Sequence, residues 1–428
     1  MAASPALSLY RVLSGLVSPV VPLLLRRRLK AGKEDAARLN ERLGQPARPR
    51  PPGPLVWLHG ASVGETVSIL PLVAPLLARG FNVMLTSGTV TSAAIADKRL
   101  PAGAFHQFIP VDTPGAAKRF IAHWKPEIGL IAESELWPNL IMAASAAGTR
   151  LAIINGRMSD RSMRQWQKLP EMIGALMGAF SLCLAQSEGD AARYRALGAS
   201  GATSPGNLKF DVAALGCDAA ELARLKAALG GRPAVVMAST HPGEEEILIA
   251  SHVSAAARLP GLVTVIAPRH PQRGEPIAAL ARAAGLSVAR RSTGEGIGTR
   301  TDLYIADTIG ELGLIYRLAP LAFLGGSYIP HGGQNPIEPA KLGVGVLHGS
   351  HVFNFTDVYA AFDAAGGSLA VDDPDRLGET IAALLADPAW LAAMQGAAQA
   401  SAEALGGALD RTLAALEPLL AAAREGAR

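Results

Sequence analysis

The chain has 428 residues, of which 49% are hydrophobic and 18% charged, so it is not disordered and has enough apolar material for two or three domains. Two cysteines, Cys183 and Cys217, are too few for a disulfide framework or a four-cysteine zinc site and are expected to be free thiols. The net charge is +4, but residues 1–50 carry ten Lys and Arg against three Asp and Glu, a net +7, which leaves −3 for residues 51–428. A body without net positive charge argues against nucleic-acid binding.

The N-terminal arm combines an apolar run with a basic cluster. Residues 12–25 are uncharged, and Arg26 to Arg28 with Lys30 follow at once. This run is shorter than the ~20 residues of a spanning helix, and Pro19 and Pro22 weaken it further. A basic cluster after the apolar run does not fit a cleavable signal. We therefore predict a segment that lies on an anionic membrane surface. A short tilted span and a helix that docks on the core remain the alternatives.

After a proline-rich connector at residues 45–54, short apolar runs alternate with helical patterns. The expected strands are residues 55–59, 82–87, 105–110, 128–132, 151–155, 182–186, 234–239, 262–267, 303–306, 321–324, 344–347 and 368–371. The expected helices include residues 65–79, 89–99, 115–124, 243–259 and 276–284, and residues 388–428 are expected to be helical throughout. This alternation indicates βαβ units, and the continuous apolar runs indicate parallel strands covered on both faces.

The fold class is therefore α/β, with two Rossmann-like domains whose parallel sheets face a central cleft. We expect a membrane-associating arm at 1–50, an N-terminal domain at 51–210, a C-terminal domain at 211–400 and a helical tail at 401–428. The stretch 203–218 is expected to act as the linker between the two halves.

Ligands bind outside the carboxyl ends of parallel strands, so the turns after the strands are informative. The first such turn, residues 59–66, leads into a helix that begins near Glu65. This carboxylate has two open interpretations: an ordinary acid at a helix start, or a general base at the mouth of a cleft. A second turn carries Glu133 and Glu135 ahead of Trp137 and Pro138. Side chains two residues apart in extended chain point to opposite sides, so one of these carboxylates is expected to face the cleft.

Other post-strand turns suit an anionic ligand. Residues 155–162 contain Arg157 and Arg161, and Arg269 stands at the tip of a later strand. Residues 331–340 form a glycine-rich loop that leads into a helix start, which is either an ordinary capped helix or a phosphate cradle. The chain has neither a P-loop motif nor an intact G-x-G-x-x-G, which argues against an ATPase or a dinucleotide-dependent dehydrogenase.

Taken in order, these motifs resemble those of the 3-deoxy-D-manno-octulosonic acid (Kdo) transferases. The matching segments are residues 59–65, 133–139, 155–162, 206–211, 268–271, 307–312 and 332–340. The resemblance implies a GT-B glycosyltransferase fold, cytidine monophosphate–Kdo (CMP-Kdo) as donor and the lipid A precursor lipid IVA as acceptor, in lipopolysaccharide synthesis. It also implies a site on the cytoplasmic face of the inner membrane of a Gram-negative bacterium, with no metal and no cofactor.

The resemblance also assigns roles to residues. Glu65 falls at the position of the general base of an inverting transfer, and Glu133 or Glu135 with Lys209 fall where the family stabilises the transition state. The positions that correspond to CMP binding are Pro268, Arg269, Ile309, Gly310, Glu311, Asn335, Pro336, Ile337 and Glu338.

The sequence leaves two other protein classes as alternatives. Another GT-B nucleotide-sugar enzyme, such as a soluble epimerase, predicts no role for the apolar and basic arm. A non-catalytic, two-domain binding protein of the periplasmic type requires a cleavable signal, which we do not find in residues 1–50. The number of Kdo units transferred and the oligomeric state do not follow from the sequence.

Overall fold

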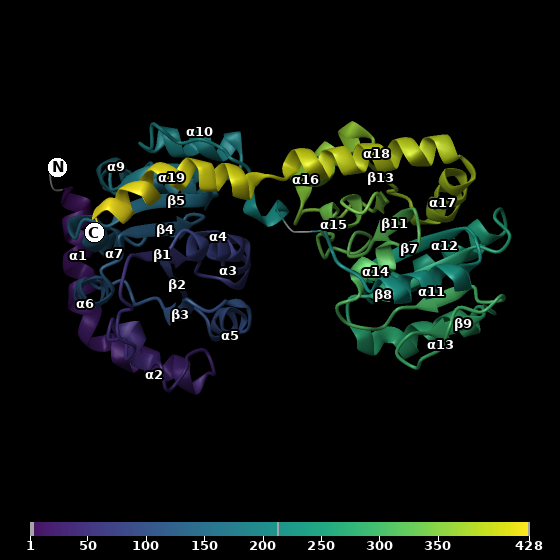
Figure 1. Ribbon diagram of the computed structural model, residues 1–428, viewed down its shortest axis with the longest axis horizontal. Helices are drawn as coiled ribbons and strands as arrows, with labels where there is room; N and C mark the ends of the chain where they lie inside the picture. Colours follow the sequence, from purple (N-terminus) through teal and green to yellow (C-terminus); the bar gives the residue numbers. More distant parts are fainter. Residues whose placement is uncertain (1–3, 212–213, 427–428) are drawn as a thin grey trace. The chain divides into compact units, whose positions relative to one another are not determined.

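The computed structural model describes residues 4–211 and 214–426, coloured in Figure 1 from purple at the N-terminus to yellow at the C-terminus. The chain divides into two compact units: Met1–Asp211 with Gly406–Arg428, and Val212–Leu405. The division at residue 211 lies inside the stretch expected to be the linker. The last part of the chain, expected as a separate helical tail, belongs to the first unit.

In the described residues, the first unit contains a six-stranded parallel sheet with the order β3-β2-β1-β4-β5-β6. The strands are β1 (Leu55–His59), β2 (Asn82–Ser87), β3 (Ala104–Phe108), β4 (Ile128–Ala132), β5 (Arg150–Gly156) and β6 (Phe180–Ala185). The chain moves outward from β1 to β3 and then returns to place β4 on the other side of β1. The turns after β1 and β4 therefore lie where the strand order reverses, the place at which open α/β sheets bind ligands.

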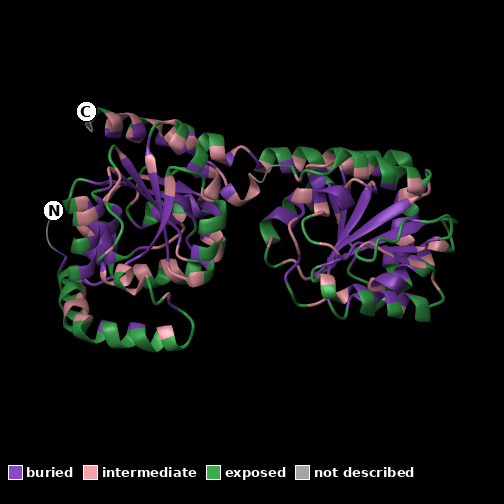
Figure 2. Ribbon diagram, turned by 60° about the horizontal axis from the view of Figure 1, so that its bottom comes forward, coloured by how far each residue is buried: buried purple, intermediate pink, exposed green. Residues whose placement is uncertain are grey.

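Helices cover both faces of this sheet, as its buried, continuously apolar strands require (Figure 2). On one face Trp57 packs against Phe120, with ring centroids 5.5 Å apart, and on the other Leu58 belongs to the same cluster as Leu416. The helices of this unit are α1 (Pro5–Val17), α2 (Val21–Lys30), α3 (Val63–Ile69), α4 (Val73–Ala78), α5 (Val90–Arg99), α6 (Pro114–Trp124), α7 (Pro138–Ala146), α8 (Asp160–Trp166), α9 (Pro170–Met177), α10 (Glu188–Ala196) and α19 (Ala408–Gly426).

The C-terminal helix α19 completes the second face of the first sheet. The Asp211 carboxylate accepts the backbone N–H groups of Gly407 and Leu409 and so caps the helix start. The prediction of continuous helix over residues 388–428 is wrong, because the helical path breaks at Gly406 and Gly407, where Gly407 has φ of 74°. Glycine adopts this left-handed conformation at little cost, so the break lets the chain return to the first unit.

The second unit is built on a seven-stranded parallel sheet of described residues, in the order β13-β12-β11-β7-β8-β10-β9. Its strands are β7 (Ala234–Thr240), β8 (Val263–Pro268), β9 (Val288–Arg290), β10 (Leu303–Ile305), β11 (Leu321–Leu324), β12 (Gly345–His348) and β13 (Ser368–Ala370). Its helices are α11 (Ala219–Leu229), α12 (Glu245–Ala256), α13 (Gly274–Ala283), α14 (Leu312–Tyr316), α15 (Ile337–Ala340), α16 (Thr356–Ala365), α17 (Leu377–Ala386) and α18 (Pro388–Leu405). Apolar clusters lie on both faces of this sheet as well.

The N-terminal arm forms α1, a short 3-10 turn at Ser18–Val20, and α2. Together they make a helical stretch of 26 residues, Pro5–Lys30, in which an 18-residue window has a mean hydropathy of 1.5, so the stretch is long and apolar enough to cross a membrane by length and composition. The uncharged run of residues 12–25 is thus part of a longer helix that begins seven residues before residue 12, so the alternative of a span stays open. Length and composition alone do not distinguish a span from a surface helix.

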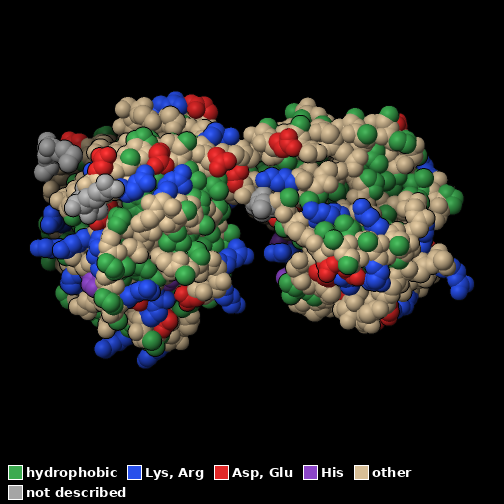
Figure 3. Space-filling view, viewed as in Figure 1, with side chains coloured by type: hydrophobic (Ala, Val, Ile, Leu, Met, Phe, Trp, Pro, Cys, Tyr) green, Lys and Arg blue, Asp and Glu red, His purple; other side chains and the backbone are tan. Residues whose placement is uncertain are grey.

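The arm is nevertheless attached to the first unit along one side. The Tyr10 hydroxyl donates to Asp112 Oδ2 at 2.9 Å, and Asn139 Nδ2 donates to Ser14 Oγ at 2.9 Å. The other side exposes large apolar side chains, between 46% and 71% exposed: Leu9, Val12, Leu13, Leu16, Val17, Val20, Leu23 and Leu24. In Figure 3, Lys and Arg side chains (blue) accompany hydrophobic ones (green) on the left and lower side of this unit, where α1 and α2 lie.

Candidate active site

The turn after β1 presents Glu65 at the start of α3. Ser62 is the N-cap: its Oγ accepts the Glu65 N–H at 3.3 Å and donates to Glu65 Oε1 at 2.7 Å. Glu65 Oε2 accepts the N–H of Ala61, the residue before the N-cap, at 2.8 Å, so the contacts form a variant of the capping box. The turn is so tight that a Cβ on Gly60 would lie 2.9 Å from the Thr66 nitrogen. Glu65 thus has the helix-start role considered from the sequence, and its half-buried carboxylate also lies at the ligand-binding edge of the sheet.

Glu133 and Glu135 follow β4, and their side chains have different partners. Glu133 Oε1 is 2.9 Å from Lys209 Nζ, whereas Glu135 Oε2 accepts the indole N–H of Trp137 at 2.8 Å. Burial raises the pKa of Glu135 to about 7, with a further contribution from the negative charges of Glu65 and Glu133, against the Trp137 hydrogen bond. The structure therefore brings all four predicted catalytic residues, three carboxylates and one ammonium group, to one edge of the first sheet.

Lys209 reaches this edge because Asn155 holds the segment that carries it. Asn155 Oδ1 accepts the Leu208 N–H at 2.9 Å, and Leu208 opens the 3-10 turn Leu208–Phe210. Asn155 itself has φ of 48°, which is uncommon for a residue other than glycine. A residue at the end of β5 thus positions a cation that follows 54 residues later.

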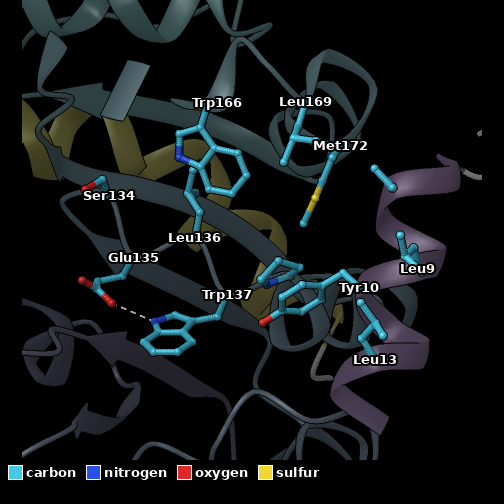
Figure 4. Close-up of a pocket in the computed structure, with 12 residues that line it drawn as sticks. Leu9, Tyr10, Leu13, Ser134, Glu135, Leu136, Trp137, Trp166, Leu169 and Met172 are labelled. Carbon is cyan, nitrogen blue, oxygen red and sulfur yellow. Dashed lines mark hydrogen bonds between the residues drawn. The ribbon is translucent and has the colours of Figure 1, made fainter. Parts of the chain in front are cut away.

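An apolar pocket of about 610 Å³ opens beside Glu135. It is lined by Ala6, Leu9, Tyr10, Leu13, Ser134, Glu135, Leu136, Trp137, Pro138, Trp166, Leu169 and Met172. Figure 4 shows side chains of α1 on one side of the pocket and Glu135, bonded to Trp137, at its rim. The pocket joins segments far apart in the sequence, and its existence did not follow from any one motif.

In the second unit, five of the predicted nucleotide-binding residues line one small pocket of about 100 Å³: Pro268, Arg269, Ile309, Gly310 and Glu311. The Ile309 side chain is 85% exposed, which is unusual for a large apolar group. Both carboxylate oxygens of Glu311 lie 2.6 Å from Arg291 nitrogens, and this partner lowers the pKa of Glu311. The Glu311 side chain is therefore already paired within the protein.

The four remaining predicted residues, Asn335 to Glu338, surround the start of α15. Asn335 Oδ1 accepts the Ile337 N–H at 3.1 Å, and the helix begins at Ile337, within the segment where a helix start was expected. Burial raises the pKa of Glu338, against the positive charge of Arg269 and a hydrogen bond with Asn335. Glu338 is thus close enough to Arg269 to interact with its charge, although it does not line the small pocket.

One feature of this edge was missed from the sequence. The fully buried Glu244 carboxylate accepts four backbone N–H groups: those of Gly326, Ser327 and Tyr328 at 2.7 to 3.0 Å and that of His241 at 3.1 Å. It thereby joins the turn after β7 to the turn after β11. In the sequence, Glu244 is the first of three consecutive glutamates at a helix start, and nothing in that pattern distinguishes it from the other two.

Two further observations concern metal ligands and the arginine-containing loop. No group of three or more His, Cys, Asp and Glu side chains in residues 4–211 and 214–426 is arranged to hold a metal ion. Arg157 and Arg161, in a loop expected to suit an anion, are both exposed.

Comparisons with known proteins identify the class and then the family. A crystal structure of a glycosyltransferase from Rickettsia africae aligns with a TM-score of 0.56 at 12% identity, over 86% of this chain and 99% of that one. With its two parallel α/β sheets, the fold is that of a GT-B glycosyltransferase.

The family model described as 3-deoxy-D-manno-octulosonic-acid transferase (kdotransferase) matches residues 37–212. The 3-deoxy-D-manno-octulosonic acid transferase of Bordetella pertussis is 39% identical over 95% of this chain and 98% of its own length. A probable mitochondrial 3-deoxy-D-manno-octulosonic acid transferase of Arabidopsis thaliana is 36% identical over 93% and 92%. The chain therefore belongs to the Kdo transferase family and is an enzyme that transfers Kdo. Membership of this family sets aside the soluble epimerase and the periplasmic binding protein.

The Glu244 contacts predict that replacing this residue by the isosteric glutamine strongly lowers the free energy of unfolding. Glu244→Gln places an amide NH₂ against two of the four N–H donors, so the free energy of unfolding of the second unit should fall by about 3 kcal/mol. Hydrogen exchange should also speed up at Gly326, Ser327 and Tyr328, as read by mass spectrometry alongside chemical denaturation. Glu246→Gln, an exposed neighbour, is the matched control; equal protection in the two variants would contradict the role.

The raised pKa of Glu135 predicts a pH dependence of stability. Between its ordinary pKa of 4.5 and the folded value of about 7, the folded state holds a proton that the unfolded chain releases. The contribution of this group is therefore favourable below about pH 4.5 and is lost as the pH rises through 7. Between pH 5 and 8, the free energy of unfolding should fall less steeply with rising pH in Glu135→Gln than in the wild-type protein, as measured by chemical denaturation. The exposed Glu171→Gln should follow the wild-type slope.

Proposed function

We propose that this enzyme transfers Kdo from CMP-Kdo to lipid IVA on the cytoplasmic face of the inner membrane, in lipopolysaccharide synthesis, with inversion of configuration. One observation carries the acceptor assignment: the cluster of Glu65, Glu133, Glu135 and Lys209 lies beside an apolar pocket walled by the N-terminal arm. A sugar linked to acyl chains needs an apolar surface next to the reacting hydroxyl. A water-soluble acceptor has no use for that surface.

In the proposed reaction, Glu65 takes the proton of the acceptor's primary hydroxyl while the hydroxyl oxygen forms a bond to the anomeric carbon of Kdo. The bond from that carbon to the CMP phosphate breaks in the same displacement. Positive charge develops at the anomeric carbon, which Glu133 or Glu135 stabilises, and Lys209 stabilises the departing phosphate.

The donor assignment rests on the carboxyl edge of the second sheet. Arg269 lines a small pocket there and supplies positive charge for the phosphate of CMP-Kdo or the carboxylate of its sugar. The exposed Ile309 side chain offers an apolar surface for the cytosine ring, and Asn335 with Glu338 offers hydrogen-bonding groups for the ribose. Because the Glu311 side chain is paired with Arg291, its contribution comes from its backbone.

The arm is the proposed membrane-binding element. The exposed apolar side chains of α1 and α2 match the acyl region of a bilayer, and the basic residues after them match anionic headgroups, which contribute about 1 kcal/mol per cation near the surface. Because the arm is also attached through Tyr10 and Ser14, membrane contact holds the apolar pocket at the bilayer surface.

The role of Glu65 as the base is tested against its role in the capping box. Glu65→Gln should lower kcat by about a hundredfold or more and leave CMP binding unchanged. Ser62→Ala is the matched control, because it removes the cap but keeps the carboxylate, so it should cost about 1 kcal/mol of stability and little turnover. Turnover is measured by mass analysis of lipid IVA after incubation with CMP-Kdo.

The turnover of Glu135→Gln is measured in the same assay, because a carboxylate with a pKa of about 7 is a competent base at neutral pH. Near-normal turnover in Glu65→Gln together with a loss in Glu135→Gln would transfer the role to Glu135.

The membrane role of the arm is tested without deleting it. Leu16→Glu combined with Leu23→Glu places charge on two exposed apolar positions, 71% and 63% exposed, and should abolish pelleting with vesicles that contain anionic phospholipid. The matched control, Val253→Glu with Phe353→Glu, makes the same change at positions 48% and 62% exposed in the second unit and should pellet like wild type. Unchanged pelleting of the arm variant would refute the assignment.

A further inference from the structure

A second and larger cavity of the first unit lies among α1, α6 and α7. Its volume is about 990 Å³, and its walls are α1, α6, α7 and the loops that lead into β4 and β5. Figure 1 shows α1, α6 and α7 gathered at one side of the unit, and the three helices contact one another. The cavity runs along α7 from Pro138, at the helix start, to the loops before β4 and β5, and Pro138 is the one lining residue that it shares with the pocket beside Glu135.

The lining of the cavity is apolar within and positively charged around it. Leu7, Ile121, Met142 and Ala143 supply apolar surface from all three helices. Lys118 and Ile121 lie one turn apart on α6, and Lys125 is the left-handed residue that ends this helix. A ligand between the helices therefore meets apolar groups and ammonium groups together.

Four cations line this cavity: Arg11, Lys118, Lys125 and Arg150. Among the described residues, none of the four lies within ion-pairing distance of a carboxylate. The one acid in the lining, Glu127, is already satisfied, because it pairs with Arg50 at 2.9 Å and accepts the Leu55 N–H at 2.6 Å. The cavity therefore has a positive charge that the protein itself does not balance.

We propose that this cavity binds one anionic phospholipid, with its phosphate among the four cations and an acyl chain on the apolar surface between α6 and α7. A free phosphate would leave the apolar surface wet, and a neutral lipid would leave the cations unbalanced. The source is the membrane on which the enzyme is proposed to work, so the inference rests on that placement for the origin of the ligand and not on the transfer chemistry.

Helix α1 connects this cavity with the apolar pocket beside Glu135, because it lines both. Residues Leu7 and Arg11 of α1 line the phospholipid cavity, whereas Leu9 and Leu13 line the apolar pocket beside Glu135. A lipid held against the first flank stabilises the position of α1 and hence the wall of the second pocket.

The test uses the full-length protein in a nonionic detergent and native mass spectrometry. Phosphatidylglycerol is offered as the anionic lipid, phosphatidylcholine with the same chains as the zwitterionic one, and glycerol 3-phosphate as a free phosphate. We expect one retained phosphatidylglycerol per chain and neither of the other two. Lys118→Glu with Lys125→Glu should weaken retention by about tenfold or more, and so should Ala143→Trp, which fills the apolar surface.

The matched control is Lys98→Glu with Arg99→Glu, which makes the same change of charge at two exposed positions of α5, outside the cavity lining, and should leave retention unchanged. The proposal is overturned if the two charge-reversal variants lose lipid equally, if phosphatidylcholine binds as well as phosphatidylglycerol, or if glycerol 3-phosphate binds alone. A species of twice the chain mass, lost on Ala143→Trp, would instead assign the cavity to a second copy of the chain. None of these outcomes depends on Kdo transfer, so they are distinct from a failure of the proposed reaction.

Discussion

The catalytic edge of the first unit depends on the backbone of the turn after β4, which places Glu133 against Lys209. The Lys209 side chain is 38% exposed, and an exposed ion pair contributes only about 0–1 kcal/mol, so this pair does not hold the turn. Glu133 adopts φ of 52°, a strained conformation that costs about 1–3 kcal/mol. Its N–H donates to the Ile154 carbonyl at 3.1 Å and its carbonyl accepts the Tyr194 hydroxyl at 2.8 Å, which offset that strain. The backbone of the turn therefore places the Glu133 carboxylate beside Lys209, and the attraction between the two charges adds little to its stability.

The second unit also has strained backbone at the carboxyl edge of its sheet. Ser239, near the end of β7, has φ of 57°, and a Cβ on Gly325 after β11 would lie 2.6 Å from the Ser239 oxygen, so the two turns are in close contact. The buried Glu244 joins these turns through four N–H donors. In both units, therefore, strained backbone at a strand end is held by buried polar groups, and this keeps the edge rigid enough to orient ligands.

A structural feature could be predicted from the sequence when the residues that determine it are neighbours in the chain. All twelve expected strands are present, with ends shifted by at most two residues, because each is a continuous apolar run. The additional strand β9 is only three residues long and ends in an arginine, so it has no such run. The helix expected over residues 65–79 is interrupted by a 3-10 turn at Leu70–Leu72, since Pro71 lacks the N–H that a regular helix needs. The capping box of Ser62 and Glu65 is visible in the sequence, but a pairing such as that of Glu133 with Lys209, across 76 residues, is not.

The arm illustrates why local patterns gave several open interpretations for one segment. The same helix docks on the core through Tyr10, as the core-docking interpretation expects, and also exposes an apolar outer side, which is the basis of the proposed membrane contact. The connection runs through Asp112, which is buried and accepts the Tyr10 hydroxyl as well as the N–H groups of Asn139 and Leu140 at the start of α7. Since α7 begins directly after Trp137, the partner of Glu135, this one carboxylate connects the arm to the turn that carries Glu133 and Glu135. The position of the arm and the geometry of that turn are therefore coupled through the hydrogen bonds of Asp112.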